Sequence, residues 1–288
     1  MRYAMRFLVS NVFFRVAAIV AMMLECTMHV NAIRPVTSAY TVEYGSAHLS
    51  DTYLTPLKYS GWHAGVSYER FQAMRFCPDD WIMRLRFNIG VDRTRNTARN
   101  ATLWNLDVSA GWAMMRRWRL PASVTLAAGG STTLEGGALY LSRNGNNPVS
   151  AKAAWTLNLA GLATWQTRLG RVPVTIGWQP ELPVIGAFFS PDYGELYYEI
   201  YLGNHSNLAH AAWWGNRFVL DNLVTADLRL GATSLRLGYK GHILTSKVNN
   251  IVTREFTHSF VIGVSGEWLS LAPDHKPSDE ARIISAYY

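Results

Sequence analysis

The chain has 288 residues and a formal net charge of +7; 49% of its residues are hydrophobic, 12% aromatic and 16% charged. The charged fraction is well below the roughly 25% of soluble domains, and no uncharged apolar stretch reaches the about 18 residues of a membrane-spanning helix. The composition therefore argues against a helical membrane protein. Basic residues that are scattered, without a recognition motif, argue against a nucleic-acid partner.

The first 32 residues have the three parts of a secretory signal peptide. Three arginines within the first fifteen residues give a positive start, residues 16–24 form an apolar run, and Val30-Asn31-Ala32 offers a cleavage site with small residues. The apolar run is too short to cross a bilayer, whose hydrocarbon core needs about 20 residues. We therefore predict that residues 1–32 are removed on export.

Alternating apolar and polar residues predict strands from residue 40 onward. In residues 62–71, Trp62 and Val66 lie on one face and His63 and Ser67 on the other, because successive side chains of a strand point to opposite faces. The same alternation predicts strands over residues 40–45, 81–92, 104–114, 155–159, 234–240 and 256–265. Less regular candidates cover residues 123–128, 134–141, 172–182, 193–202 and 222–230.

These segments predict an all-β fold, an antiparallel transmembrane β-barrel of about 12 strands over residues 33–270. The length agrees, because strands of about 9–11 residues with their loops use roughly 21 residues each. Tryptophans near strand ends, such as Trp112 and Trp118, are typical of the aromatic girdles of such barrels. Residues 271–288 are predicted to form a polar tail or an extra terminal strand that ends in Tyr287-Tyr288.

The polar faces of the strands are predicted to line a water-filled lumen. Arg84 and Arg86 lie on the polar face of the segment over residues 81–92, and two arginines that face an apolar core would be costly without partners. The cations either favour anionic solutes or pair with Glu69, Asp107 and Glu43 and hold the interior shut; the sequence leaves both open. The lumen-lining candidates are His63, Ser67, Glu69, Arg84, Arg86, Asn88, Asp107, Arg236 and Lys240.

Residues 182–192 are predicted to form a loop or an inward fold of one, because Pro183, Gly186 and Pro191 interrupt any long strand. Acids and tyrosines gather just after these residues. They form either a constriction or ligand site in the lumen, or part of a structural loop that fills and stiffens the barrel. The candidates are Asp192, Tyr193, Glu195 and Glu199.

The sequence gives little support for catalytic chemistry. His205 and Ser206 are adjacent, so in a strand they would point to opposite faces, whereas in a loop Asn207 could orient the histidine. These three residues are weak catalytic candidates, and the sequence does not favour an enzyme. The eight histidines are dispersed without the spacing of a metal site, so no metal and no cofactor is expected.

Two stretches resemble a known family. Residues 45–62 have the sequence GSAHLSDTYLTPLKYSGW, and residues 188–204 have the sequence FFSPDYGELYYEIYLGN. Both resemble an uncharacterised Bacteroidetes outer-membrane protein family, the domain of unknown function 3316. The resemblance covers most of the chain after the signal peptide and implies an outer-membrane barrel. The family has no established activity, so the resemblance carries over no catalytic residue.

The leading hypothesis is an outer-membrane β-barrel of unknown specific activity, a small or plugged pore for solutes in the cell outer membrane. One alternative is a phospholipase-like barrel that hydrolyses outer-membrane lipid. Another is a secreted soluble β-sandwich binding protein, which would bury its apolar face between two sheets. The expected partners are outer-membrane lipid and, during insertion, the barrel-assembly machinery. The sequence indicates neither the solute nor the oligomeric state.

Overall fold

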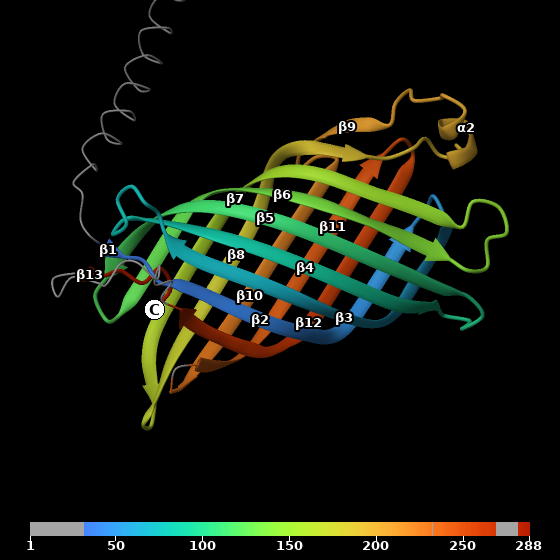
Figure 1. Ribbon diagram of the computed structural model, residues 1–288. Helices are drawn as coiled ribbons and strands as arrows, with labels where there is room; N and C mark the ends of the chain where they lie inside the picture. The colour runs from blue at the N-terminus through green and yellow to red at the C-terminus, as the bar shows by residue number, and fades with distance from the viewer. Residues whose placement is uncertain (1–31, 232, 269–281) are drawn as a thin grey trace, which may run out of the picture.

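The computed structural model describes residues 32–231, 233–268 and 282–288, and its strands form a closed antiparallel barrel (Figure 1). Apart from Ala32, the predicted signal peptide lies outside these residues. The ring closes because β8 pairs with β10. Its ten strands are β2 (Val36–Asp51), β3 (Thr55–Ala73), β4 (Trp81–Asn96), β5 (Thr102–Leu120), β6 (Val124–Leu141), β7 (Val149–Leu169), β8 (Val172–Phe189), β10 (Arg217–Leu230), β11 (Thr233–Val248) and β12 (Ile251–Trp268).

Strand alternation gives the barrel an apolar outer face. Val66 is 49% exposed and Leu134 is 60% exposed, although both are aliphatic side chains in the middle of long strands. A soluble sandwich would bury such residues between its sheets, whereas this ring presents them to its surroundings. Other exposed members of this outer face are Tyr40, Val42, Tyr44, Phe87, Ile89, Leu106, Val108, Leu157, Leu159, Val224, Phe260, Ile262 and Val264.

The barrel has ten strands, and the prediction of about twelve was too high. The predicted segments over residues 123–128 and 134–141 belong to one strand, β6, in which Gly129 lies where any Cβ would clash with the backbone of Met114. The predicted strand over residues 193–202 belongs to a connection that contains the short helix α2 (Tyr197–Tyr201). The strands are also longer than predicted, up to 21 residues in β7, so fewer of them use the same length of chain.

The prediction of a loop over residues 182–192 is wrong for most of that segment, because β8 continues to Phe189. Its far end pairs with the four-residue strand β9 (Ala209–Ala212) instead of β10. Pro183 lies at a register irregularity of the β7–β8 ladder and beyond the last residue that β8 pairs with β10. The missing N–H of this proline therefore costs no hydrogen bond to β10.

The two ends of the barrel differ. At the terminal end, β1 (Ala32–Ile33) pairs in parallel with β13 (Arg282–Ile283), and turns as short as residues 170–171 join the barrel strands. At the opposite end, called the loop end below, residues 190–216 form the largest connection in the described chain and carry α2 and β9 (Figure 1). Among the described residues, no helix is long and apolar enough to cross a membrane.

Candidate functional site

Apolar side chains fill the terminal half of the lumen. Phe71, Ile82, Met115 and Leu162 come from four different strands and form one buried cluster. The cluster also includes Tyr287 from the end of the chain. The C-terminal residues therefore turn back into the barrel after β13 and complete its filling at this end.

Several contacts hold Tyr287 in place. Its ring centroid lies 5.0 Å from that of Phe71, and its hydroxyl lies 3.3 Å from the Oγ1 of Thr225. The guanidinium carbon of Arg236 lies 5.3 Å from the ring centroid, within the range of a cation–π interaction. A Cβ at Gly177 would clash with the tyrosine hydroxyl, so the facing strand leaves room for this side chain.

An ionic layer crosses the lumen next to the apolar cluster. Arg236 is 1% exposed and donates from Nε to Asp227 at 2.7 Å and from Nη1 to Glu69 at 3.0 Å. Glu69 also accepts two hydrogen bonds from Arg86, at 2.8 and 3.2 Å. The layer consists of Arg84, Arg86, Arg236, Glu69, Glu181, Asp227 and Gln179.

The three arginines of this layer are matched by three carboxylates. Arg84 is 2% exposed and donates to Glu181, while Gln179 bridges Arg86 and Glu69 through its amide. Buried charges require such partners because an unpaired ion in a low-dielectric interior is costly. The layer is thus electrically neutral and spans the barrel from β3 and β4 to β8, β10 and β11.

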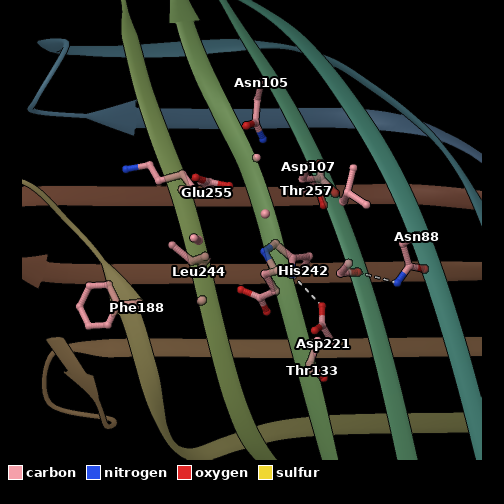
Figure 2. Close-up of a pocket in the computed structure, with 18 of the residues that line it drawn as sticks. Asn88, Asn105, Asp107, Thr133, Phe188, Asp221, His242, Leu244, Glu255 and Thr257 are labelled. Carbon is pink, nitrogen blue, oxygen red and sulfur yellow. Dashed lines mark hydrogen bonds and ion pairs between the residues drawn. The ribbon is translucent and has the colours of Figure 1, made fainter. Parts of the chain in front are cut away.

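Beyond the ionic layer, the loop half of the lumen holds a cavity (Figure 2). His63 Nδ1 lies 2.6 Å from Asp92, which also accepts a hydrogen bond from Asn105 at 2.9 Å. On another wall, His242 Nδ1 lies 2.7 Å from Asp221. The polar groups of the cavity wall are therefore mostly paired, while Phe188 and Leu244 contribute apolar surface to the same wall.

Two carboxylates of the cavity have no hydrogen-bond partner or ion pair among the described residues, Asp107 of β5 and Glu255 of β12. Both line the cavity, and Figure 2 shows them among the polar side chains that surround it. Asp107 leans over Gly90 of the neighbouring strand, because a Cβ there would lie 2.8 Å from its Oδ2. Among the carboxylates that line the cavity in the described part of the chain, these two are therefore open to a solute.

Polar contacts narrow the loop end of the barrel. Asp51 is fully buried and accepts a hydrogen bond from Lys152 at 2.5 Å and from Ser150 at 3.2 Å. The hydroxyl of Tyr197 in α2 accepts a hydrogen bond from the Ala151 N–H at 2.6 Å. Burial of this hydroxyl raises the pKa of Tyr197 to about 12, so the tyrosine stays neutral.

The structure places all nine lumen-lining candidates in the lumen. Besides the residues of the ionic layer, Lys240 donates to Glu43 at 2.8 Å, and Asn88 donates to Ser109 at 2.9 Å. Ser67 lies 2.5 Å from the Oγ1 of Thr41 on the adjacent strand. Of the three acids predicted to pair with the cations, Glu43 and Glu69 do so, whereas Asp107 forms no ion pair among the described residues.

The loop candidates stabilise their own connection. Glu195 accepts hydrogen bonds from the Asp192 N–H at 2.9 Å and from Asn204 at 2.8 Å, while Glu199 accepts from the Leu196 N–H at the start of α2. Tyr193 is largely exposed. These residues line none of the cavities described for the lumen, so the structure does not bring them into a constriction.

The catalytic candidates lie in an exposed loop after α2 and are not assembled. Ser206 donates its hydroxyl to Asn204 at 2.8 Å, and the carbonyl of Asn207 accepts from Asn249 at 3.1 Å. No hydrogen bond between His205 and Ser206 occurs in the described chain. Nor does that part of the chain contain a group of three or more His, Cys, Asp and Glu residues arranged to hold a metal ion.

The residues predicted to line the lumen do not include Gln179, Glu181, Asp227 or Tyr287. The alternation of Trp178 with Gln179 and Glu181 would have placed the latter two on the polar face of a strand. No local pattern predicts Tyr287, because its position depends on the chain folding back into a lumen that other strands build.

The fold and the lumen define a closed β-barrel with an apolar outer face and an interior that contains both an apolar cluster and charged side chains. The chain belongs to the family described as "Protein of unknown function (DUF3316)", whose model matches residues 6–275. The resemblance drawn from residues 45–62 and 188–204 is thereby confirmed at the level of the family. No curated protein sequence matches the chain.

Among solved structures, the chain is similar to outer-membrane barrels at low sequence identity. The outer-membrane protease OmpT from Escherichia coli is 6% identical, with a TM-score of 0.47 over 81% of this chain and 97% of that chain. The translocator domain of the autotransporter NalP from Neisseria meningitidis is 9% identical, with a TM-score of 0.37 over 90% and 96%. Neisserial surface protein A is 12% identical, with a TM-score of 0.29 over 79% and 96%.

Proposed function

We propose that this protein is an outer-membrane β-barrel whose lumen is occluded at rest, so that it does not act as an open diffusion pore. The closed ring supports the membrane location, because lipid offers the backbone no hydrogen-bond partner, and only helices and closed barrels pair all their backbone groups internally. The exposed aliphatic and aromatic outer face supports it further. Outer-membrane lipid is then the immediate partner, and the barrel-assembly machinery acts during insertion.

The observation that carries the proposal is the pair of barriers in series within the lumen. The ionic layer spans the barrel, and the apolar cluster with Tyr287 lies between this layer and the terminal end. In a barrel of about eight strands the inward side chains can fill the interior, whereas barrels of about 16–18 strands leave an aqueous channel. With ten strands, the lumen is narrow enough for these two groups of side chains to block it.

The cavity of the loop half is then a vestibule, open to solvent on one side of the block and closed on the other. A polar solute that enters from the loop end meets paired histidines and the two unpartnered acids Asp107 and Glu255. We therefore assign solute binding, rather than passage, to the resting state.

Fractionation and gel mobility test the location and the barrel. We expect the protein in the outer-membrane fraction, with a band that shifts when the detergent sample is boiled, because a closed barrel resists detergent until heated. A protein recovered in the soluble fraction with no heat-dependent shift would overturn the proposal.

Planar-bilayer recordings test the occlusion. We expect little steady conductance from the wild type, and little from either a chain truncated after residue 281 or R84A/E181A, since each retains one barrier. The combined variant should conduct more than either, provided that its gel band still shifts on boiling. Open-pore conductance of the wild type would contradict occlusion, and an unchanged combined variant would show that Arg84, Glu181 and the C-terminal residues are not what blocks the lumen.

A further inference from the structure

Five cations project from the outer face of the barrel at its loop end, and we call them the basic flank. Together with β2, which lies between β12 and β3, the strands that carry them are consecutive in the sheet, in the order β11, β12, β2, β3 and β4. The basic flank consists of Lys247 on β11, Arg254 on β12, Lys58 on β3, and Arg93 and Arg95 on β4.

The outward direction of these side chains follows from their neighbours. Asp92, Thr94 and Asn96 are buried, and Asp92 lines the cavity, so Arg93 and Arg95 between them lie on the opposite face of β4. On β12, Thr253 and Glu255 line the cavity, which places Arg254 outside. Lys58 precedes the buried Tyr59, and Lys247 follows Ser246 of the cavity wall.

The register holds the members of the basic flank close to aromatic and hydroxyl side chains. Arg93 lies opposite both Trp62 and Trp104, and its guanidinium carbon is 5.5 Å from the Trp104 ring centroid. Arg95 lies opposite Ser60. Arg93 Nε is buried and has no hydrogen-bond partner, so the ring fixes this side chain while its outer N–H groups stay open to a ligand.

The basic flank contains no acid. None of its five cations forms an ion pair with any carboxylate that the structure describes. The outward residues that lie between these cations on β2 and β3 are neutral or weakly basic, such as His48, Ser50 and Ser60. Uncompensated positive charge on a surface that faces lipid requires an anion from outside the protein.

The same strands lack this feature at the terminal end. There, among the described residues of these five strands, the outward cation is Arg70, and it donates to the side chain of Gln72 at 3.0 Å. The exposed cations of the terminal end lie on other strands: Arg116 of β5 lies near Trp118, and Arg119 forms an ion pair with Asp79. The group of unpaired cations on adjacent strands at the loop end therefore points to a ligand in the leaflet there.

We infer that the basic flank binds the phosphate groups of an anionic glycolipid in the membrane leaflet at the loop end. This inference rests on the proposed outer-membrane location, with the chain termini on the opposite side. Arginine suits the role because its planar guanidinium binds two phosphate oxygens at once, and aromatic side chains at interfacial depth hold the glycolipid beside it. The serine hydroxyls between the cations supply further donors to phosphate or sugar.

Native mass spectrometry of the detergent-purified full chain, titrated with diphosphoryl lipid A, tests the inference. We expect K58Q/R93Q/R95Q/R254Q to bind this lipid at least about tenfold more weakly than the wild type. The matched control, R116Q/R119Q/R168Q/R171Q, removes the same charge from exposed cations at the terminal end and should bind within about twofold of the wild type. Phosphatidylethanolamine should bind both variants and the wild type equally.

The possible outcomes separate the inference from the proposed function. A heat-dependent gel shift of each variant establishes the barrel independently of lipid binding. If the barrel is intact and both quadruple variants bind lipid A alike, the basic flank is not its site and the inference is wrong. If inorganic phosphate at millimolar concentration displaces the lipid fully, the site recognises free phosphate and the assignment to lipid is also wrong.

Discussion

The two halves of the lumen are built by the same ten strands, yet the main cavity lies in the loop half. In the terminal half, inward positions carry Phe71, Ile82 and Met115, and the C-terminal residues add Tyr287. In the loop half, Leu49 and Leu103 belong to a second buried apolar cluster, while Gly90 and polar side chains elsewhere leave the cavity. The number of strands therefore sets only the maximum width of the lumen, and the size of the inward side chains determines how much of that width stays open.

The halves differ in their charges as well. Each arginine of the ionic layer has a carboxylate partner, and this layer is shielded from solvent. In the cavity, the carboxylates of Asp107 and Glu255 remain without one. In the filled half of the lumen each charge needs a partner from the protein, because no water solvates it there. In the cavity, water can solvate an unpaired carboxylate.

Glu181→Ala should produce the largest effect, a loss of about 3–5 kcal/mol in the free energy of unfolding. The substitution leaves Arg84 buried without its carboxylate and also removes the acceptor of Ser131 and Asn158. Urea unfolding in lipid vesicles, followed by tryptophan fluorescence, measures the change. R84A/E181A removes both charges and should be less destabilised than E181A alone; a double variant that is destabilised as much as the sum of the single variants would contradict the pairing.

Tyr287→Ala should cost about 3 kcal/mol, because it empties a buried aromatic position between Phe71 and Arg236. The temperature at which the unboiled gel band disappears provides the measurement. Tyr198→Ala serves as the control, since Tyr198 is 65% exposed in α2, and its effect should stay within about 0.5 kcal/mol. Equal effects of the two substitutions would show that the C-terminal residues do not occupy the lumen.

Asp92→Asn and Asp107→Asn compare two carboxylates of one cavity and should have the smallest effects. Asp92 accepts hydrogen bonds from His63 and Asn105, so its replacement should cost about 1–3 kcal/mol. Asp107 has no such partner, and its replacement should change stability by less than about 0.5 kcal/mol. Urea unfolding of both variants is the test. A larger loss of unfolding free energy for D107N than for D92N would show that the Asp107 carboxylate has a hydrogen-bond partner in the folded protein.

The outer face of the barrel follows from the sequence, because alternation requires only neighbouring residues. An example is the alternation in β3, where the structure places Val66 on the outer face and His63 on the inner face, as predicted. The number of strands does not follow in this way. Glycines that permit close strand approach, as at Gly129, have the same local appearance as glycines in turns.

The partners within the lumen could not be predicted from one sequence. Arg84 and Glu181 are 97 positions apart and meet only because the ring closes between β8 and β10. Tyr287 enters from the end of the chain and lies against Phe71, more than two hundred positions earlier. Such contacts depend on the strand register and on barrel closure, which are properties of the whole fold.

The pairing of β8 with β9 beyond Glu181 leaves a weak seam in the barrel wall. The β8–β10 ladder joins only eight positions, Asp221 to Leu228 opposite Val174 to Glu181, while the ladder between β5 and β6 extends from Leu103 to Leu120. Residues 217–220 of β10 therefore pair with β11 alone. Strands separate at a lower cost where they share fewer hydrogen bonds, so β8 and β10 should separate before the other strand pairs. Amide hydrogen exchange in β10 should therefore begin at residues 217–220.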